Sequence, residues 1–228
     1  MKTNAPYLNS LLLCLLTAAA SASGFAQDAT DKKEWKDLFD GKTLKGWTDA
    51  AGKAPGAGWK VEDGVIHRAG KGGDIFTEAE YYNFDLEFDW KVEKGSNSGL
   101  KYRFAAYNGK SIGCEYQVLD DDNHPNGQNP KQTAGSLYDV IAPNAEVKKL
   151  KRVGEWNTSR IVAKDTKVEH WLNGVKILEI DMDSDEWAAA LQKSKFRDAP
   201  TFGQKDGRIM LQDHGDVVWF RNIRIREL

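Results

Sequence analysis

FDLEFDWKVEK, residues 84–94, decides the fold because its apolar and charged residues alternate without a break. A period of two places successive side chains on opposite faces of a β-strand. The segment therefore predicts a strand with one face in the core and the other in water. The apolar face would consist of Phe84, Leu86, Phe88, Trp90 and Val92.

Similar alternation follows this segment on its C-terminal side. Residues 100–107 (LKYRFAAY) and residues 114–119 (CEYQVL) each predict one strand. Residues 157–181 predict three more strands, the last two joined by Asn173-Gly174, a pair typical of two-residue hairpin turns. Two final strands are expected within residues 207–215 and 217–228.

Two further signals complete the outline. Residues 59–69 (WKVEDGVIHRA) predict two strands that meet at Asp63-Gly64. Residues 184–194 (SDEWAAALQKS) predict one helix, with Asp183 or Ser184 as its N-cap. Many strands, one helix and no alternation of strands with helices indicate an all-β antiparallel sandwich, in which the aromatic faces of two sheets meet.

The N-terminal residues have the features of an export signal. Residues 1–26 contain an early lysine, the apolar run 11–16 and small residues that lead to Ala26. We interpret them as a signal peptide cleaved near Ala26, which places the protein in the periplasm or outside the cell. Residues 27–34 form a charged linker, and residues 35–228 form a single domain. No later segment is apolar over the roughly 20 residues that a membrane span needs.

Composition excludes other classes. Lysine and arginine number 32 against 34 acidic residues, so no basic surface for nucleic acid is expected. After removal of the leader only Cys114 remains, so packing rather than an intramolecular disulfide must stabilise the domain. The chain has 8 tryptophans, which can serve either the core or sugar stacking. We expect four of them in the core, namely Trp47, Trp59, Trp90 and Trp219.

The polar positions of the alternating strands predict a shared groove. If one sheet is concave, the side chains that point away from the core line its outer face. An ordinary solvated face, with Glu115 in a cross-strand ion pair to Lys101 or Arg103, is the alternative. Carboxylates, ammonium groups and amides are also what a sugar's hydroxyl groups need. The predicted groove residues are Glu87, Asp89, Lys101, Arg103, Glu115, Gln117, Met210, Gln212 and His214.

Eight segments, in order along residues 39–215, resemble the bacterial 3-keto-disaccharide hydrolase domain family. They are FDGKTLKGW (39–47), WKVEDGVI (59–66), GSNSGLKYR (95–103), EYQVLDDDNHP (115–125), AGSLYDVIAP (134–143), GEWN (154–157), HWLNG (170–174) and LQDHG (211–215). The resemblance implies a concanavalin A-like jelly-roll sandwich, export beyond the inner membrane, and action on glycosides whose C3 hydroxyl is oxidised to a ketone. Members act as hydrolases or as lyases that eliminate the aglycone across C1 and C2.

Such chemistry assigns roles to the groove residues. An elimination needs a base, a cation or metal for the enolate oxygen, and an acid for the leaving oxygen. Glu115 and His214 are the candidate bases, and the alternative for His214 is a turn residue beside Gly215. Lys101 or Arg103 would hold the oxyanion. We expect the substrate to be oriented by Gln117 and Gln212.

The loop after residues 114–119 is expected at the end of the groove. Asp120 and His124 would shape the rim and touch substrate, and Tyr138 could stack on a sugar ring. Residues 120–127 (DDDNHPNG) lack the spacing of a helix-loop-helix calcium site. Glu115 and His214 could instead hold a divalent metal ion, although no cofactor is required.

Two alternatives remain open from the sequence. The protein could be a carbohydrate-binding module without chemistry, since a fold alone does not fix function. It could also be a glycoside hydrolase of unoxidised glycans, which needs two carboxylates across the scissile bond. Glu115 with Asp89 or Glu87 could supply that pair.

Overall fold

The computed structural model describes residues 1–2 and 33–228 of the chain. The predicted signal peptide and most of the predicted linker lie outside the described residues. Residues 33–228 form one compact unit. In this described part, no helix is both long enough and apolar enough to cross a membrane.

The larger of two antiparallel sheets has eight strands in the described chain. Their order is β11-β10-β9-β6-β13-β4-β3, and β1 pairs with β13. The strands are β1 (Lys36–Asp37), β3 (Trp59–Glu62), β4 (Val65–Arg68), β6 (Phe84–Val92), β9 (Asn157–Lys164), β10 (Lys167–Leu172), β11 (Val175–Asp181) and β13 (Val218–Glu227).

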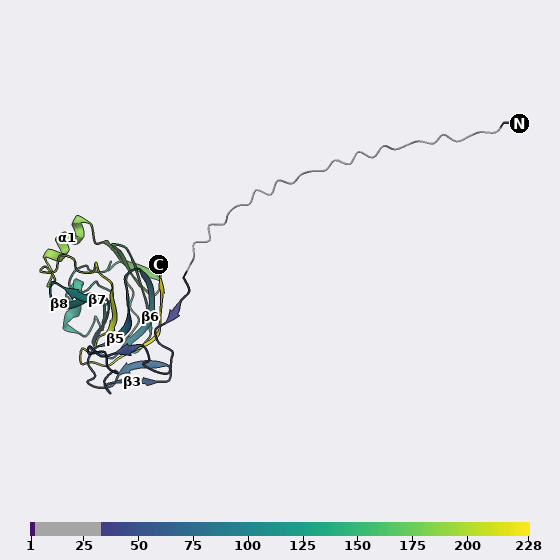
Figure 1. Cartoon of the computed structure of the whole chain (residues 1–228). Helices are drawn as coiled ribbons and strands as arrows, with labels where there is room; N and C mark the ends of the chain where they lie inside the picture. Colours follow the sequence, from purple (N-terminus) through teal and green to yellow (C-terminus); the bar gives the residue numbers. More distant parts are fainter. Residues whose placement is uncertain (3–32) are drawn as a thin grey trace. The chain divides into compact units, whose positions relative to one another are not determined.

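The smaller sheet has five strands in the order β2-β5-β12-β7-β8. They are β2 (Trp47–Thr48), β5 (Ile75–Tyr81), β7 (Asn97–Tyr107), β8 (Lys110–Leu119) and β12 (Gly207–Leu211). The helix α1 (Asp185–Gln192) has Ser184 as its N-cap, as predicted, and lies at the opposite end of the sandwich from β3 (Figure 1). Two short 3-10 helices, η1 (Pro125–Gln128) and η2 (Pro130–Gln132), follow β8.

The outer edge of β8 is covered by residues 135–138. The backbone amide of Gln117 donates to the backbone carbonyl of Ser136, and the backbone amide of Gly135 donates to the backbone carbonyl of Gln117. The Tyr138 amide donates to the Glu115 carbonyl at 3.0 Å. These bonds satisfy the backbone groups that an edge strand would otherwise leave unpaired.

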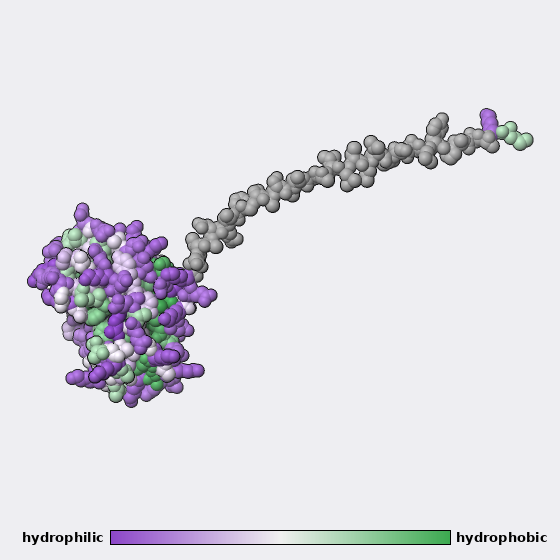
Figure 2. All heavy atoms as spheres, in the orientation of Figure 1, coloured by the Kyte–Doolittle hydropathy of each residue, from purple (hydrophilic) through white to green (hydrophobic). Residues whose placement is uncertain are grey.

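Aromatic side chains of the two sheets meet in the core. Phe84 and Phe88 on β6 make edge-to-face contacts with Tyr102 and Tyr116, at ring-centroid distances of 5.9 and 5.4 Å. These inward residues are almost completely buried. The opposite positions of each strand face outward, and most of the visible surface is hydrophilic (Figure 2).

This architecture confirms the predicted all-β sandwich. Trp47, Trp59 and Trp90 are buried, as expected. The prediction for Trp219 is wrong, because its ring is half-buried on the outer face, 4.7 Å from the Lys91 ammonium. Trp219 pairs with Lys91 across the two strands, so it shares the outward face of that charged residue.

Candidate active site on the smaller sheet

Glu115 and Lys101 lie opposite each other on the outer face of the smaller sheet. They are cross-strand partners on β8 and β7, and the Lys101 ammonium lies 3.6 Å from the Glu115 carboxylate. The Glu115 side chain is only 5% exposed. Burial raises the pKa of this carboxyl, while the positive charges of Lys101 and Lys195 oppose the rise. The site is therefore centred on a sequestered carboxylate with a shifted affinity for protons.

Lys195 and Tyr138 approach this carboxylate from the loops that cover the sheet. The Lys195 ammonium lies 4.2 Å from the centre of the Tyr138 ring. Partial burial lowers the pKa of Lys195, and the charge of Glu115 opposes that shift. The Lys195 backbone amide donates to the Asp139 carboxylate at 2.7 Å, and the Tyr138 backbone amide donates to the Glu115 carbonyl at 3.0 Å, so both residues are held in place. The site thus has a second ammonium group and the aromatic ring expected from the sequence.

His214 and Asp74 approach from loops at the ends of neighbouring strands. Burial raises the pKa of Asp74, and a hydrogen bond from the Asp213 backbone amide and the positive charge of Lys101 oppose the rise. The Asp213 carboxylate joins the two loops by accepting hydrogen bonds from the amides of Gly72 and Gly73, each at 2.8 Å. His214 is exposed to solvent. An imidazole is therefore available near Asp74 and Glu115.

Gln117 and Gln212 each leave a buried acceptor without a partner. The Oε1 atoms of both amides have no hydrogen-bond partner, although each atom is buried. The Gln117 Nε2 donates to the Asn97 Oδ1 at 3.3 Å, which fixes the direction of the amide. A buried acceptor without a partner costs free energy. A hydrogen bond from a ligand or a water molecule to either Oε1 would therefore be stabilising.

Gly99 gives Glu115 the space to lie across the sheet. A Cβ atom at Gly99 would stand 2.5 Å from the Glu115 Oε1 and 3.0 Å from its Cγ. Any other residue at this position would displace the carboxylate. The GSNSG segment of the sequence thus shapes the site as well as the strand.

The placement predicted for Arg103 is wrong. The register of β7 shifts between Tyr102 and Ala105, and Arg103 has the left-handed φ of 49°. This bulge turns the side chain away from the outer face and buries it completely. The guanidinium donates to the carbonyls of Tyr82, Gly203 and Asp165 at 2.8–3.0 Å. Arg103 therefore pins three backbone segments together and lies apart from Glu115.

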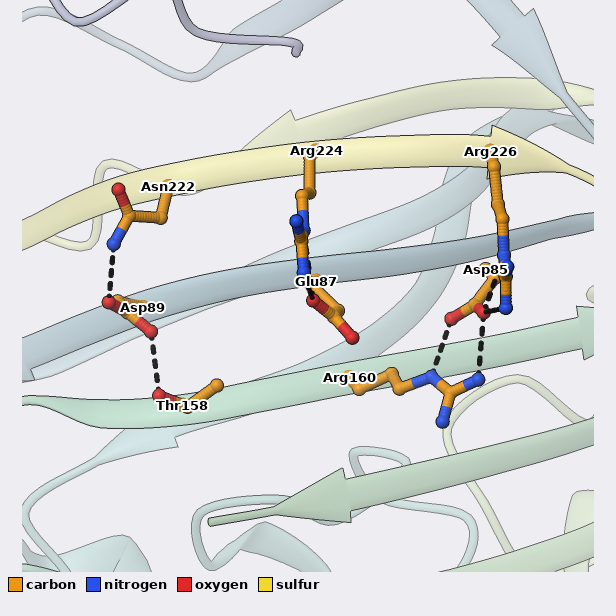
Figure 3. Close-up of polar contacts among 8 residues, drawn as sticks. All are labelled: Asp85, Glu87, Asp89, Thr158, Arg160, Asn222, Arg224 and Arg226. Carbon is orange, nitrogen blue, oxygen red and sulfur yellow. Dashed lines mark hydrogen bonds and ion pairs between the residues drawn. The ribbon is translucent and has the colours of Figure 1, made fainter. Parts of the chain in front are cut away.

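The placement predicted for Asp89 is also wrong, as is that of Glu87. Both are on β6, which belongs to the larger sheet, so their outer face is the opposite side of the sandwich. Figure 3 shows the three acidic residues of β6 between partners on β13 and β9. Asp89 accepts hydrogen bonds from Thr158 at 2.7 Å and Asn222 at 2.8 Å. Strand order, which alternation does not reveal, separates these residues from the site.

Asp120 and His124 make local structural contacts. The Asp120 carboxylate accepts hydrogen bonds from the Gly95 amide at 2.7 Å and the Asn123 side chain at 2.8 Å. The His124 Nδ1 accepts from the Asn126 amide at 3.1 Å and caps η1. These bonds use the Asp120 Oδ2 and the His124 Nδ1 and hold the loop in shape, and contact of either residue with substrate stays a prediction.

A larger pocket lies beside this loop rather than at Glu115. It has a volume of about 530 Å³ and is bordered by Asp120, Asp121 and Lys148, among others. Two of its charged side chains, Lys148 and Asp121, pair with each other at 2.6 Å. The smaller pocket of about 240 Å³ is bordered by the buried Glu115 carboxylate and by Lys101 and Lys195. We therefore place the candidate site there.

The donor set at Glu115 suits a metal ion poorly. Within residues 33–228, no group of three or more His, Cys, Asp or Glu side chains could hold a metal ion. The positive charges of Lys101 and Lys195 already act on Glu115, and they compete electrostatically with a metal cation. Glu115 and His214 would supply at most two protein ligands.

Sequence reasoning missed Asp74 and Lys195. Asp74 follows the glycine-rich stretch GKGG, and Lys195 lies in an irregular segment after α1. Neither residue belongs to a run of alternating apolar and polar residues. The alternation therefore gives no indication of which sheet face either side chain lies on. The spacing of carboxylates and lysines between Gly70 and Phe196 contains no motif that would have found them.

The fold and the site together define a β-sandwich protein with a buried carboxylate and two lysines on one sheet face. The model of the 3-keto-alpha-glucoside-1,2-lyase-like domain family matches residues 34–226. The chain belongs to this family, which confirms the resemblance found in the sequence.

Known proteins of similar sequence and structure agree with this membership. A 3-keto-disaccharide hydrolase from Bacteroides thetaiotaomicron is 35% identical over 226 residues, which cover 84% of this chain and 77% of the relative. A crystal structure from Parabacteroides distasonis, provisionally named a glycosyl hydrolase, has a TM-score of 0.76 and 36% identity, with 85% of this chain and 94% of the relative covered. These relatives support a carbohydrate-cleaving enzyme.

A more distant match shows the fold alone. The catalytic domain of a laminarinase from Thermotoga petrophila has a TM-score of 0.53 at 13% identity and covers 86% of this chain and 98% of its own. At this identity the likeness extends to the concanavalin-like sandwich and no further.

Proposed function

We propose that the protein is an exported enzyme that cleaves the glycosidic bond of 3-keto-glycosides by elimination. The observation that carries this proposal is the Glu115 carboxylate, which is buried on the outer sheet face with the Lys101 ammonium 3.6 Å away. Family membership supports a sugar substrate, and the name of the relative from Bacteroides thetaiotaomicron supports an oxidised one.

The proposed chemistry follows from the acidity of a proton beside a ketone. A base removes the proton from C2, and the electron pair forms an enolate whose negative charge lies on the C3 oxygen. Collapse of the enolate makes the C1–C2 double bond and breaks the bond from C1 to the aglycone oxygen. That oxygen leaves with the electron pair and takes a proton from an acid. Subsequent addition of water across the double bond would give net hydrolysis.

Glu115 is the preferred base in this scheme. The C2 proton and the C3 oxygen belong to adjacent carbons, so the base and the cation that serve them must be neighbours. Glu115 and Lys101 have this relation, and Lys195 provides a second positive charge. Burial also makes the carboxylate a stronger base than one in water, because its pKa is raised.

His214 and Tyr138 are the available proton donors for the leaving oxygen. Both lie within electrostatic reach of Glu115. Gln117 and Gln212 would orient the sugar through the buried acceptors that lack partners. The sugar hydroxyl groups would donate to these acceptors.

The pair of carboxylates that an ordinary glycosidase needs is not formed by Glu115 with Glu87 or Asp89. Those two residues lie on the other sheet and are engaged by arginine, threonine and asparagine side chains. An elimination requires one base rather than a pair of carboxylates, and Glu115 beside Lys101 meets that requirement.

The decisive experiment compares a 3-keto-disaccharide with its unoxidised parent, with and without a chelator. We expect turnover of the oxidised sugar only, unchanged by the chelator, and a 2-hydroxyglycal-type product detectable by NMR before any hydration. Glu115→Gln should abolish turnover, whereas Glu87→Gln on the opposite sheet is the matched control and should retain it. Cleavage of the parent sugar alone would refute the proposal. Binding of both sugars without cleavage would favour a carbohydrate-binding module.

A further inference from the structure

We infer that Asp74 is the catalytic acid that gives a proton to the leaving oxygen while Glu115 acts as the base. This inference rests on the proposed function, because Glu115 and Lys101 define where the bond is cleaved. Asp74 directly precedes β5, which is separated from Glu115 on β8 by β12 and β7. It therefore approaches the site from the side opposite to Tyr138, which is bonded to the outer edge of β8.

Strand pairing aligns Asp74 with outward positions of the smaller sheet. Cross-strand partners form a row of four completely buried core residues, one from each of β5, β12, β7 and β8. In that order they are Ile75, Leu211, Leu100 and Tyr116. The next position on each strand belongs to the outer face, because side chains alternate along a strand. This outer row consists of Asp74, Gln212, Gly99 and Gln117.

The Glu115 carboxylate reaches into this outer row. A Cβ atom at Gly99 would stand 2.5 Å from the Glu115 Oε1, so the carboxylate lies over Gly99. Two strand spacings, or about 10 Å, separate the backbones of Gly99 and Asp74. Carboxyl groups on either side of this interval can flank one glycosidic bond. Gln212 lies between them, and its buried Oε1, which lacks a partner among the described residues, can accept a sugar hydroxyl.

The loop after β12 holds the Asp74 carboxyl group in place. The Asp213 backbone amide donates to the Asp74 Oδ1 at 2.9 Å. The Asp213 carboxylate in turn binds the amides of Gly72 and Gly73, each at 2.8 Å, and the Arg68 guanidinium. Because Oδ1 accepts a hydrogen bond, Oδ2 would carry the proton of a neutral Asp74. Asp213 is thus a positioning residue, and the Asp74 Oδ2 is the atom that donates to the leaving oxygen.

Burial and charge divide the two roles between the carboxyl groups. Burial raises the pKa of both Asp74 and Glu115, but the Lys101 ammonium contacts Glu115 directly at 3.6 Å. The paired Glu115 is therefore the one to stay ionised as a base. The other candidate donors suit the task less well. Burial raises the pKa of Tyr138 above 10, which makes it a weaker acid, and His214 is exposed to solvent.

The two residues exchange their protonation states during the reaction. Glu115 takes the C2 proton, and the Asp74 Oδ2 gives its proton to the aglycone oxygen as the bond from C1 to that oxygen breaks. When water adds across the C1–C2 double bond, Asp74 takes a proton from the water that bonds to C1. Glu115 then returns its proton to C2. Net hydrolysis thus restores both residues to their starting states.

The test of Asp74 varies the acidity of the leaving group. A sugar leaves as an alcohol and needs a proton, whereas 4-nitrophenol is acidic enough to leave as its anion. Asp74→Asn keeps the shape of the side chain and removes the acid. We expect kcat/KM to fall by about 100-fold or more for a 3-keto-disaccharide, and by less than about threefold for 4-nitrophenyl 3-keto-glucoside. Activity retained on the nitrophenyl compound also shows that the variant is folded.

Variants elsewhere in the chain make the test specific. Asp37→Asn, on β1 of the larger sheet, is the matched control and should leave both kcat/KM values unchanged. Equal losses for the two substrates in Asp74→Asn would overturn the inference. A loss confined to the disaccharide in Tyr138→Phe or His214→Gln, and absent from Asp74→Asn, would overturn it as well.

The unaltered protein separates a failure of this inference from a failure of the proposed function. Cleavage of unoxidised sugars alone would refute the proposed function. The same comparison, made with an unoxidised disaccharide and 4-nitrophenyl glucoside, would then decide on Asp74. A loss confined to the disaccharide would support Asp74 as the acid, and equal losses would overturn that role. If the unaltered protein cleaves neither kind of sugar, both proposals are overturned.

Discussion

Glu115 is placed at a cost to the folded protein. Its buried carboxylate has a raised pKa, so the charged form is less favourable in the folded state than in the unfolded chain. Residues that serve chemistry often oppose stability in this way. The two effects can be separated by a neutral side chain of the same shape.

Glu115→Gln should therefore abolish activity while preserving the fold. We expect a loss of at least about 100-fold in kcat, because a positioned base contributes that much or more. The free energy of unfolding at pH 7 should stay constant or rise by about 1 kcal/mol. Urea unfolding followed by tryptophan fluorescence measures the second effect. A variant that loses activity together with several kcal/mol of stability would contradict this division.

The pH dependence of kcat/KM should report the charges around Glu115. Activity requires the ionised base, so it should rise with pH through a pKa above the ordinary value of 4.5 for glutamate. Lys195→Met removes a positive charge that favours ionisation, so the acidic limb should move to higher pH. Lys176→Met, which alters a lysine on the larger sheet, should leave the limb in place. A downward shift in Lys195→Met would contradict the assignment.

His170 lies in the core between two tyrosines and must be neutral there. Its Nδ1 lies 2.9 Å from the Gly135 carbonyl, which can only accept, so Nδ1 carries the proton. Its Nε2 then accepts from the Tyr102 hydroxyl at 2.8 Å. Burial lowers the pKa of His170 from 6.5 to about 4.

This burial predicts a loss of stability in mild acid. Between pH 6.5 and about 4, His170 is protonated in the unfolded chain but not in the folded protein. The free energy of unfolding is therefore highest above pH 6.5 and decreases as the pH falls through this range. One such group makes the free energy of unfolding change by up to about 1.4 kcal/mol per pH unit. In urea unfolding, His170→Gln should flatten the slope in this range. His67→Gln should leave it unchanged, and equal slopes in both variants would show that other groups control it.

The bulge in β7 is stabilised by one side chain. Arg103 donates to three carbonyls from separate segments of the chain. They belong to Tyr82, Asp165 and Gly203. Because the guanidinium is completely buried, these carbonyls have no water to replace it. The bulge ends the alternation that carries Lys101 outward and redirects the strand toward its turn at Asn108-Gly109.

Arg103→Met should destabilise the protein without changing the chemistry of the site. Loss of the bonds to three buried carbonyls is expected to cost about 3 to 5 kcal/mol. The variant should keep the substrate preference of the parent in its folded fraction. Arg224→Met removes a half-exposed arginine that pairs with Glu87 and should cost less than about 1 kcal/mol. Equal thermal shifts for the two variants would contradict the role of Arg103.

Alternation predicted the strands well because it records which side chains lose water. It assigned Lys101, Glu115 and Gln117 to one outward face, and the structure brings these three together. It failed at Arg103, because a bulge changes the phase and no local residue marks it as required. The hairpins at Asp63-Gly64 and Asn173-Gly174 were predictable because both positions need a left-handed backbone.

The arrangement of strands into sheets could not be obtained from periodicity. β6 and β7 follow each other directly in the chain yet belong to different sheets, so Asp89 and Lys101 face opposite sides of the molecule. The connection between them, residues 93–96, crosses from one layer to the other. Only long-range pairing, such as β6 with β13, determines this choice. Asp74 and Lys195 were missed for a related reason, since irregular loops have no period.

Export is a property of the whole chain and remains a proposal. The predicted leader, residues 1–26, should be removed when the full chain is expressed in a bacterium with a periplasm. The secreted or periplasmic form is expected to begin at Gln27, and N-terminal sequencing of that form tests this directly. Retention of Met1 on protein in the cytoplasmic fraction, with none exported, would contradict the proposal.

Residues 135–138 both shape the site and cover the edge of β8, so a change made for one role affects the other. They bring Tyr138 near the Glu115 carboxylate, and their backbone forms hydrogen bonds with the outer edge of β8, the last strand of the smaller sheet. A loop rebuilt to admit a bulkier substrate would leave β8 with vacant amide and carbonyl groups, and a neighbouring molecule could add a strand there. Broader specificity in this scaffold would thus carry a risk of aggregation.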